Sequence, residues 1–484
     1  ADNFLQMFFG WEGVGLASYL LIGFWYQRPS ANAAAIKAFV VNRVGDFGFA
    51  LGIFAAFMIL GHLDFDGAFE AVGEARDATI SFLGGEYHAM TVVCLLLFMG
   101  AMGKSAQVPL HTWLPDAMVG PTPVSALIHA ATMVVAGVFL IARTYGVFWQ
   151  AFDIGAGGIN FMAVIGGTTV IIAALLAFVQ ADIKKVLAYS TVSQLGYMVM
   201  ALGVGAWTAG IFHLFTHAFF KANLFLGAGS VGHAVHSFDM KKDMGGLKND
   251  MPQTYMTFLI GSAALAGIFP LAGFWSKDEI LLGAQSSYPI FFWVGIVGAV
   301  MTAAYMVRCV YLTFHGQFRG HGHPHESPPA ITRPLWVLTG ASVFAGLLNA
   351  PGIAKFTEWT GNETVTTAGV EHHAFSIGVA GFSTVVAVLG GLIAYSYWFR
   401  QALPRGVTQR NAALRAGYTL LENRYYLDHL YTGFIVGSLK GPVARAAYWV
   451  NQNVIDGVLN GTAWLVTRLG RVTYEILDQR VVDG

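Results

Sequence analysis

Long apolar runs, separated by short polar segments, recur along the 484-residue chain. Residues 161–180 and 379–398, for example, contain no Asp, Glu, Lys or Arg. A run of about 20 apolar residues is long enough to cross hydrocarbon as a helix. The pattern therefore predicts an all-α, polytopic membrane protein. Eleven spans are expected, at residues 4–26, 38–60, 90–113, 122–145, 161–180, 187–205, 209–233, 252–283, 289–315, 334–352 and 374–400.

Charge alternates between successive connecting segments. Lys184 and Lys185 fall in one basic segment and Lys241 and Lys242 in a later one, whereas the segment 61–74 is acidic. Because basic loops face the cytoplasm, we expect the chain to begin on the outer side and its last loop to lie inside.

The pattern changes after residue 421. From Tyr425 onward apolar residues recur at helical spacing among Asn, Gln, Asp and Arg. This predicts an amphipathic helix lying along a membrane or along partner subunits, about 80 Å long if unbroken, with kinks at Gly457, Gly461 and Gly470. The alternative is a soluble tail that folds on itself.

Composition agrees with a membrane protein, since 11% of residues are charged against about 25% in soluble domains. Net charge is zero, so no nucleic-acid partner is expected. Cys94 and Cys309 lie in separate apolar runs and form no disulfide or metal framework. Four histidines between residues 315 and 325 lack ordered ligand spacing and indicate a solvated loop rather than a metal site. The chain has no initiator Met and stops in mid-pattern, so we expect an internal segment of a longer protein.

Ionisable residues inside the apolar runs are costly in hydrocarbon and each needs a reason. Glu12 lies in Gly-Trp-Glu-Gly-Val-Gly, where glycines allow another helix to approach. Arg43 and Asp46 are one turn apart on the next predicted span. They are able to pair with each other, so a self-neutralised structural pair stands beside a functional one.

Two lysines occur where a membrane helix should break. Lys104 precedes Pro109, which lacks the backbone N–H that continues a helix. The combination recurs at Pro270, followed by Lys277 and Asp278. Two interrupted spans with an ionisable residue each are typical of the ion sites of inverted-repeat transporters. The alternative is that each lysine snorkels to a membrane surface.

Between the lysines lies a row of groups able to carry protons. His213, His217 and Lys221 are spaced by four residues and share one helix face. Histidine exchanges protons near neutral pH, and three ionisable groups on one face are hard to explain by packing. His129 stands alone, and for it a packing role is equally open.

Five segments of the chain resemble the antiporter-like L subunits of respiratory complex I, the counterparts of mitochondrial NADH-ubiquinone oxidoreductase chain 5. They are Gly10–Leu16, Gly103–Asp116, Gly120–Met133, Phe274–Glu279 and Glu422–Asp428. The resemblance extends over essentially the whole chain. One departure is Val119, where the family usually carries Glu.

The resemblance implies two inverted five-helix repeats containing broken helices, followed by a long lateral helix along neighbouring antiporter-like subunits. Residues 1–145 would form the first half, 161–315 the second repeat, 334–400 additional transmembrane helices and 425–484 the lateral helix. The family's first four helices and its last would be missing from this segment.

The resemblance also implies roles for the buried charges. Glu12 and Lys104 would interact in the first half-channel, with Arg43 and Asp46 in the same charge network. His129 would begin a central connection and Lys277, with Asp278, would gate the second half-channel. The full proton path would comprise Glu12, Arg43, Asp46, Lys104, His129, His213, His217, Lys221, Lys277 and Asp278.

The function implied is proton translocation in the membrane arm of NADH-quinone oxidoreductase, in a bacterial plasma membrane rather than the mitochondrial inner membrane. The sequence has no Rossmann glycine motif, cysteine cluster or haem motif, so NADH, FMN, iron–sulfur clusters and quinone are expected in partner subunits. The alternatives are the large subunit of a Mrp-type sodium/proton antiporter and a structural brace. The motif Pro-Leu-His-Thr-Trp, which begins at Pro109, and the long C-terminal helix favour complex I.

Overall fold

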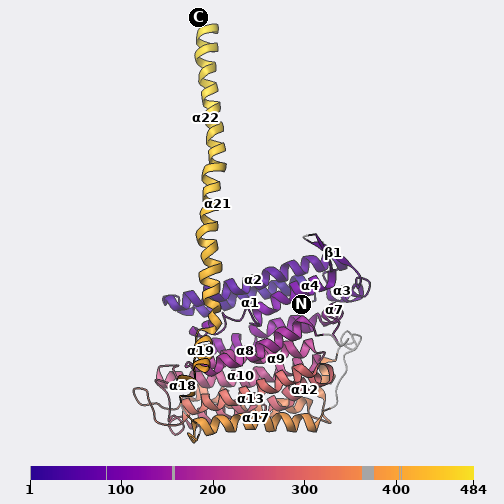
Figure 1. Ribbon diagram of the computed structural model, residues 1–484, viewed down its shortest axis with the longest axis vertical. Helices are drawn as coiled ribbons and strands as arrows, with labels where there is room; N and C mark the ends of the chain where they lie inside the picture. Colours follow the sequence, from indigo (N-terminus) through magenta and orange to yellow (C-terminus); the bar gives the residue numbers. More distant parts are fainter. Residues whose placement is uncertain (1, 83, 155–158, 362–374, 403, 405) are drawn as a thin grey trace. The chain divides into compact units, whose positions relative to one another are not determined.

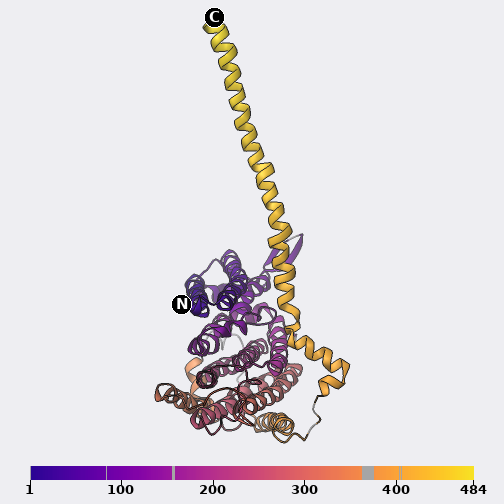
Figure 2. The same cartoon turned by 90° about the vertical axis from the view of Figure 1, so that its left-hand side faces the viewer.

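The computed structural model describes residues 2–82, 84–154, 159–361, 375–402, 404 and 406–484 (Figure 1). It divides into two compact units, residues 1–422 and 423–484. The first unit consists mainly of helices that run side by side, and Figure 2 shows many of them nearly end-on. A short hairpin that the sequence pattern did not predict, β1 (Thr79–Phe82) and β2 (Gly85–His88), pairs antiparallel in the acidic segment.

Eight helical segments within the described residues are long and apolar enough to cross a membrane. They correspond to eight of the predicted spans: α1 (Phe4–Ile22) with the short turn η1 (Gly23–Trp25), α2 (Pro29–Leu60), the interrupted segment Thr122–Arg143, α8 (Phe161–Val179), α9 (Ile183–Gly203), α13 (Pro289–Phe314), α14 (Pro329–Phe344) with η5 (Ala345–Asn349), and α17 (Ile377–Trp398). Residue 374, the first of the predicted span 374–400, lies outside the described residues.

The other three predicted spans carry the polar features. The span predicted at 90–113 is helical only over α4 (Ala89–Lys104), and the span predicted at 252–283 is two helices, α11 (Pro252–Ala266) and α12 (Ala272–Ser287). Both predicted breaks are therefore confirmed. The third span, α10 (Trp207–Val235), has 29 residues, yet its polar stripe leaves it outside the eight apolar spans.

A third interruption was not predicted. The segment Thr122–Arg143 consists of α5 (Thr122–Ala126), a wide π turn η3 (Leu127–Ala131), a tight turn η4 (Met133–Val135) and α6 (Ala136–Arg143). Thr132, between the two turns, has φ −124° and ψ −79°, which is outside the helical region. The segment contains Pro only in its first turn, so no helix-breaking residue marks this interruption.

Helix α9 is enclosed by other helices, and the whole of its most apolar stretch is buried. It meets α8 at two glycines, since a Cβ added at Gly196 would lie 2.8 Å from the carbonyl oxygen of Gly166. Only glycine allows two membrane helices to approach so closely. This contact puts the backbones of α8 and α9 against each other at the centre of the first unit.

Shorter helices lie in the connecting segments of the first unit. They are α3 (Phe65–Val72), η2 (Asp116–Val119), α7 (Tyr145–Ala151), α15 (Lys355–Thr360), α18 (Val407–Arg410) and α19 (Ala412–Glu422).

The second unit is helical from Leu427 to Val482. Its α-helical parts are α20 (Leu427–His429), α21 (Ala444–Val450) and α22 (Asp456–Val472), joined by wider π-helical turns. The predicted kinks at Gly457, Gly461 and Gly470 are wrong, because α22 runs unbroken through all three. Large apolar side chains are exposed throughout this unit, so a tail that folds on itself is wrong as well.

Candidate functional site

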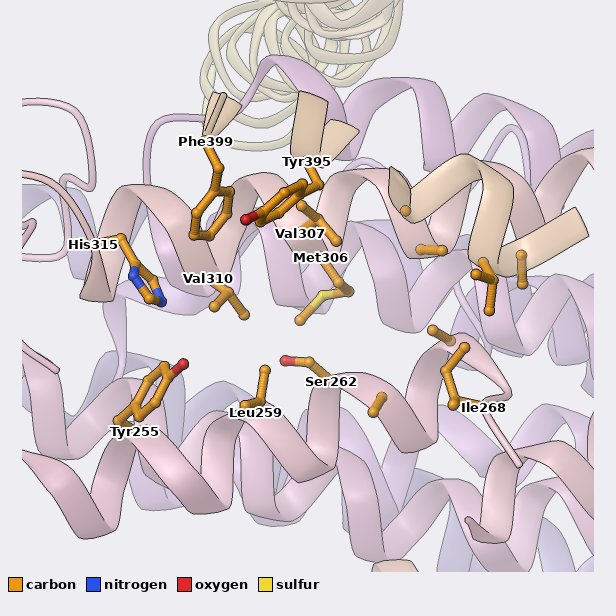
Figure 3. A pocket seen from close by; sticks show the side chains of 16 residues that line it. Tyr255, Leu259, Ser262, Ile268, Met306, Val307, Val310, His315, Tyr395 and Phe399 are labelled. Atoms are coloured by element: carbon orange, nitrogen blue, oxygen red, sulfur yellow. The ribbon is translucent and has the colours of Figure 1, made fainter. Parts of the chain in front are cut away.

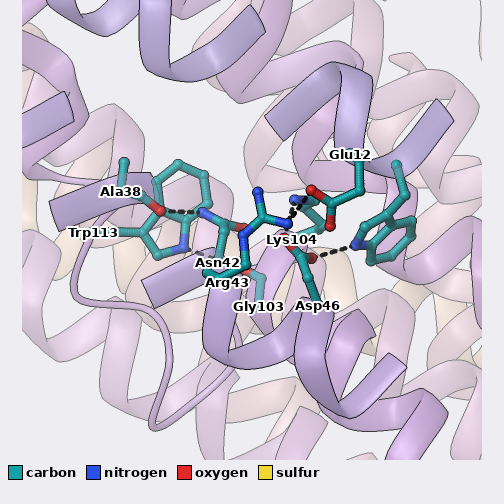
Figure 4. Close-up of polar contacts among 9 residues, drawn as sticks. Glu12, Ala38, Asn42, Arg43, Asp46, Gly103, Lys104 and Trp113 are labelled. Atoms are coloured by element: carbon teal, nitrogen blue, oxygen red, sulfur yellow. Dashed lines mark hydrogen bonds and ion pairs between the residues drawn. The ribbon is translucent and has the colours of Figure 1, made fainter. Parts of the chain in front are cut away.

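Four charged residues from α1, α2 and α4 meet at the first break (Figure 4). The Lys104 ammonium donates to Asp46 Oδ2 over 3.1 Å, and Trp11 Nε1 donates to Asp46 Oδ1 over 2.6 Å. The side chains of Lys104 and Asp46 are 0% and 2% exposed. Arg43 forms a second ion pair with Glu12. The site is thus a cluster of two acidic and two basic side chains, in which the Lys104–Asp46 pair is enclosed by protein.

The observed ion pairs differ from the Arg43–Asp46 pair that the sequence allowed. Self-neutralisation of Arg43 by Asp46 is wrong: Asp46 binds Lys104 and Arg43 binds Glu12. Although the two residues lie one turn apart on α2, the ion partners come from two other helices. Glu12 also interacts electrostatically with both Asp46 and Lys104, so the four groups form one network.

Lys104 is held at the end of a helix, in a space that a glycine leaves open. It is the last residue of α4, where the free carbonyl groups of the helix terminus favour a cation. A Cβ at Gly15 would lie 2.9 Å from Lys104 Nζ, so any larger residue there would displace the ammonium. Trp113 Nε1 donates to the Gly103 carbonyl over 3.1 Å and ties the loop after Pro109 back to α4.

A single hydroxyl links the first break to the interruption in Thr122–Arg143. Ser105 Oγ donates to the Val134 carbonyl over 2.7 Å and accepts from the Val138 N–H over 3.1 Å. Ser105 is 0% exposed. In a regular helix the Val138 N–H would donate to the Val134 carbonyl, four residues earlier. The Ser105 hydroxyl bonds to both groups, so it takes the place of the one helix hydrogen bond that the interruption opens.

Replacing Ser105 with alanine is expected to leave these two buried backbone groups without their partner. Each unsatisfied group costs about 1–3 kcal/mol, so the unfolding transition of the purified full-length protein should fall to lower temperature. The exposed Ser286→Ala variant is the control and should stay within about 0.5 kcal/mol of the parent. Equal transitions for the two variants would contradict the assignment of Ser105 as the link.

His129 lies on the π turn η3 and is 0% exposed. Its ring meets that of Trp113 edge to face, with centroids 5.9 Å apart. Neither ring nitrogen has a hydrogen-bond partner among the described residues. Lys184 interacts electrostatically with this ring, so His129 lies between two regions of charge rather than in a purely apolar core.

Lys184 was expected in a basic loop, and that prediction is wrong. It belongs to the first turn of α9, is 1% exposed and donates to the Gly120 carbonyl over 2.8 Å. The neighbouring Lys185 and the helix-capping Asp182 gave the segment the composition of a loop. No sequence signal separates the buried lysine from the one beside it.

The three ionisable groups of the predicted polar stripe on α10, His213, His217 and Lys221, are each 0% exposed. His213 hydrogen-bonds through Nδ1 to Ser276 Oγ at 2.9 Å and through Nε2 to Gln194 Oε1 at 3.0 Å. Lys221 donates to the Ser190 hydroxyl and to the Leu187 carbonyl. These partners are neutral oxygens, in contrast to the carboxylate that holds Lys104.

His217 completes the stripe on α10. Its ring centroid lies 6.2 Å from that of His213. It interacts electrostatically with Lys221, and its ring lies within hydrogen-bonding reach of the backbone of Ala130, next to His129. His217 thus lies between the π turn η3 and Lys221.

Lys277 lies at the second break, as Lys104 lies at the first. Lys277 Nζ donates over 2.8 Å to the carbonyl of Leu265, in the last turn of α11, and lies 5.3 Å from the centre of the Tyr197 ring. Asp278 accepts a hydrogen bond from Ser383 of α17. Lys277 is 2% exposed and Lys104 is enclosed too, so snorkelling is wrong for both lysines.

Two charged residues, one buried and one half-buried, were not predicted as site residues. Arg308 of α13 is 3% exposed and donates over 2.8 Å to the carbonyl of Gln180, where α8 ends. Glu279 accepts a hydrogen bond from Asn349 over 2.8 Å. The charge of Arg308 inside an apolar run was a usable signal. No group of three or more His, Cys, Asp or Glu residues in the described ranges could hold a metal ion.

Broken membrane helices with buried lysines define the chain as an antiporter-like membrane protein. Residues 1–302 match the family described as NADH:quinone oxidoreductase/Mrp antiporter, transmembrane. The chain belongs to the family of NADH-quinone oxidoreductase subunit L. Subunit L from Rickettsia bellii is 46% identical over 487 residues, which cover 98% of this chain and 74% of that protein. NAD(P)H-quinone oxidoreductase chain 5 from Picosynechococcus sp. is 44% identical over 96% of this chain and 73% of its own length.

A solved structure of the Mrp complex from a Dietzia species has the same fold, with a TM-score of 0.73 and 24% identity. The match covers 98% of this chain, which spans about half (49%) of that one. The predicted family and the all-α, antiporter-like fold are confirmed.

Proposed function

We propose that this chain translocates protons in the membrane arm of NADH-quinone oxidoreductase. The observation that carries the proposal is the fully enclosed Lys104–Asp46 pair at the end of broken helix α4. A buried ion pair is costly to form and costly to break. A pair of this kind beside a second pair of charges suits a switch better than a structural brace.

The first half, residues 1–145, would act as a charge switch. With all four groups ionised, the cluster of Glu12, Arg43, Asp46 and Lys104 has no net charge. The proton affinity of a buried lysine depends on how close its counter-charge lies. Movement of Lys104 from Asp46 toward Glu12, or of Arg43 away from Glu12, would therefore change how tightly Lys104 holds its proton.

The middle of the path would run over His129, His217, His213 and Lys221. Buried polar atoms are nearly always hydrogen-bonded, to water where protein offers nothing. The ring nitrogens of His129 have no hydrogen-bond partner among the described residues, which favours a water molecule at that point of the row. Lys277 would receive the proton in the second half, residues 161–315, where it interacts electrostatically with His213 and Lys221.

Other parts of the enzyme would lie in partner subunits. FMN, iron–sulfur clusters, NADH and quinone belong there in this proposal, and this chain would supply no redox cofactor. Residues 334–400 would add transmembrane helices, and residues 425–484 would run along neighbouring antiporter-like subunits, covering the exposed apolar side chains of that unit. The membrane would be the bacterial plasma membrane.

The second candidate is the large subunit of a Mrp-type sodium/proton antiporter, favoured by the fold match to the Mrp complex. The higher identity to subunit L over a larger share of the related protein supports complex I. Subunits that co-purify with the full-length chain would decide between them. A peripheral arm with flavin and iron–sulfur clusters would select complex I, and its absence would select the antiporter.

Lys221→Gln tests the proposed path at its centre. Glutamine can still donate to Ser190 and Leu187 but cannot carry a proton, so we expect proton uptake driven by NADH to slow about tenfold, or ~1.4 kcal/mol. Uptake is measured with a pH-sensitive dye in vesicles containing the assembled complex, in sodium-free buffer.

The exposed Lys242→Gln variant is the matched control and should pump normally. Full uptake by Lys221→Gln would remove this lysine from the path. Uptake by the parent complex that requires added sodium would favour the antiporter function instead.

A further inference from the structure

A cavity of about 600 Å³ lies between α11, α13 and α17 (Figure 3). Its volume falls in the range of about 300–1,000 Å³ that is usual for small-molecule sites. Most of its lining is apolar, and the hydroxyl of Ser262 is already donated to the Phe258 carbonyl over 2.7 Å. The interior therefore suits a hydrocarbon ligand.

The cavity is elongated along the helices. On α17 the lining residues extend from Ala387 to Phe399, the residue after the helix, twelve positions further on. Twelve helical residues span about 18 Å at 1.5 Å per residue. On α11 it extends from Tyr255 to Ala266, nearly the same length. One leaflet of a bilayer contributes half of a hydrocarbon core about 30 Å thick, so the cavity matches the length of one acyl chain.

The cavity opens to the outside of the first unit at membrane depth. Leu259, Val388 and Tyr395 line it and are 36%, 39% and 40% exposed, whereas Met306 and Ala387 at its base are 2% exposed. A lipid chain could therefore enter sideways from the bilayer, which surrounds membrane-spanning helices.

One end of the cavity is aromatic and positively charged. Figure 3 shows Tyr255, His315, Tyr395 and Phe399 gathered there, as tyrosines gather at membrane interfaces. The Lys248 ammonium lies 5.5 Å from the centre of the Tyr255 ring.

The positive charge at this end comes from lysine and arginine. Burial and the neighbouring Lys248 lower the pKa of His315, the residue that follows α13. Lys248 and Arg400, which directly follows Phe399, supply the cations. Both belong to the basic segments predicted to face the cytoplasm.

The other end reaches the break between α11 and α12. Ile268 and Ala266 line it, and the carbonyl that accepts the hydrogen bond of Lys277 belongs to Leu265, one residue before Ala266. A molecule that fills the cavity would thus touch the helix end that holds the second buried lysine.

We propose that this cavity binds one acyl chain of an anionic phospholipid, with the lipid phosphate near Lys248 and Arg400. The length of the cavity suits an acyl chain, and the two cations favour a negatively charged headgroup. The site is independent of the proton path and would exist even if the chain carried no protons.

The test uses phosphatidylglycerol with a photoreactive group near the end of one acyl chain, reconstituted with the full-length chain in its complex. After illumination, mass spectrometry should find the label on α11 and α13 lining residues. Ser262→Phe fills the cavity and should remove this labelling. Lys248→Gln should weaken it about fivefold, as expected for about 1 kcal/mol per lysine near a lipid headgroup.

Two controls match these variants. Leu392→Phe adds the same ring to an exposed position of α17 outside the cavity, and Lys242→Gln removes an exposed charge elsewhere; both should label like the parent. If Ser262→Phe does not assemble, Gly391→Leu replaces it, since a Cβ there would lie at ordinary contact distance, 3.7 Å, from Val307.

Three results would overturn the proposal, and the second and third concern the identity of the ligand. One is labelling of the lining that persists in the filled variant. The second is equal labelling by phosphatidylcholine with the same chains, and the third is displacement by a long-chain quinone but not by phosphatidylglycerol; either would mean that the cavity holds a different ligand.

Discussion

Replacing Lys104 with methionine is expected to abolish proton uptake by the reconstituted complex while its subunits remain assembled. Methionine has a similar length and no exchangeable proton, and groups that transfer protons contribute factors of about 10²–10⁴ to rates. The measurement is dye-detected acidification of vesicles after NADH is added. The control is Lys355→Met, at an exposed surface pair with Glu358, which should pump normally.

The double variant Lys104→Met with Asp46→Asn separates chemistry from stability. Removing Lys104 alone leaves the buried Asp46 without its ion partner, although Trp11 still donates to it, so part of the loss would come from a disturbed structure. The double variant removes the uncompensated charge and should recover thermal stability without recovering uptake. Normal uptake by either variant would exclude Lys104 from the path.

Asp46→Asn alone should have the second-largest effect. Breaking a buried ion pair by removing one partner costs about 3–5 kcal/mol, and Lys104 would lose the carboxylate to which it donates over 3.1 Å. We expect a lower unfolding temperature of the purified complex and uptake far below that of the parent, although above that of Lys104→Met.

Glu12→Gln is the matched comparison, because it removes one carboxylate from the same cluster. Glu12 and Arg43 are 25% and 43% exposed, so the loss of stability should be smaller than for Asp46→Asn. An equal or larger loss in Glu12→Gln would show that Lys104 depends on Glu12 instead.

Sequence was sufficient where backbone chemistry decides the structure. Pro109 and Pro270 lack an N–H, so the breaks in the third and eighth predicted spans could be expected near these two residues. Proline alone does not ensure a break, because Pro334 lies inside α14 without ending it. The interruption at Thr132 could not be found in this way, since it contains no glycine or proline. It depends on tertiary hydrogen bonds such as those of Ser105.

The pairing within the charge cluster was beyond the sequence for a different reason. Spacing showed that Arg43 and Asp46 could meet on one helix, but their partners depend on how α2 is rotated against α1 and α4. The same limit applies to Lys184 and Arg308, whose burial is decided by neighbouring helices. Residue types thus predicted which groups matter, and packing determined which of them touch.

The enclosure of α9 has a consequence for how the protein is made. Of the eight apolar spans within the described residues, α9 has the lowest mean hydropathy and α8, directly before it, the highest. In the finished protein α9 contacts other helices and needs little affinity for lipid. During synthesis, however, it must leave the ribosome and enter the bilayer before later helices surround it. The glycine contact between Gly166 and Gly196 allows α8 and α9 to insert together as a hairpin, so α8 would anchor a partner that is poorly suited to insert alone.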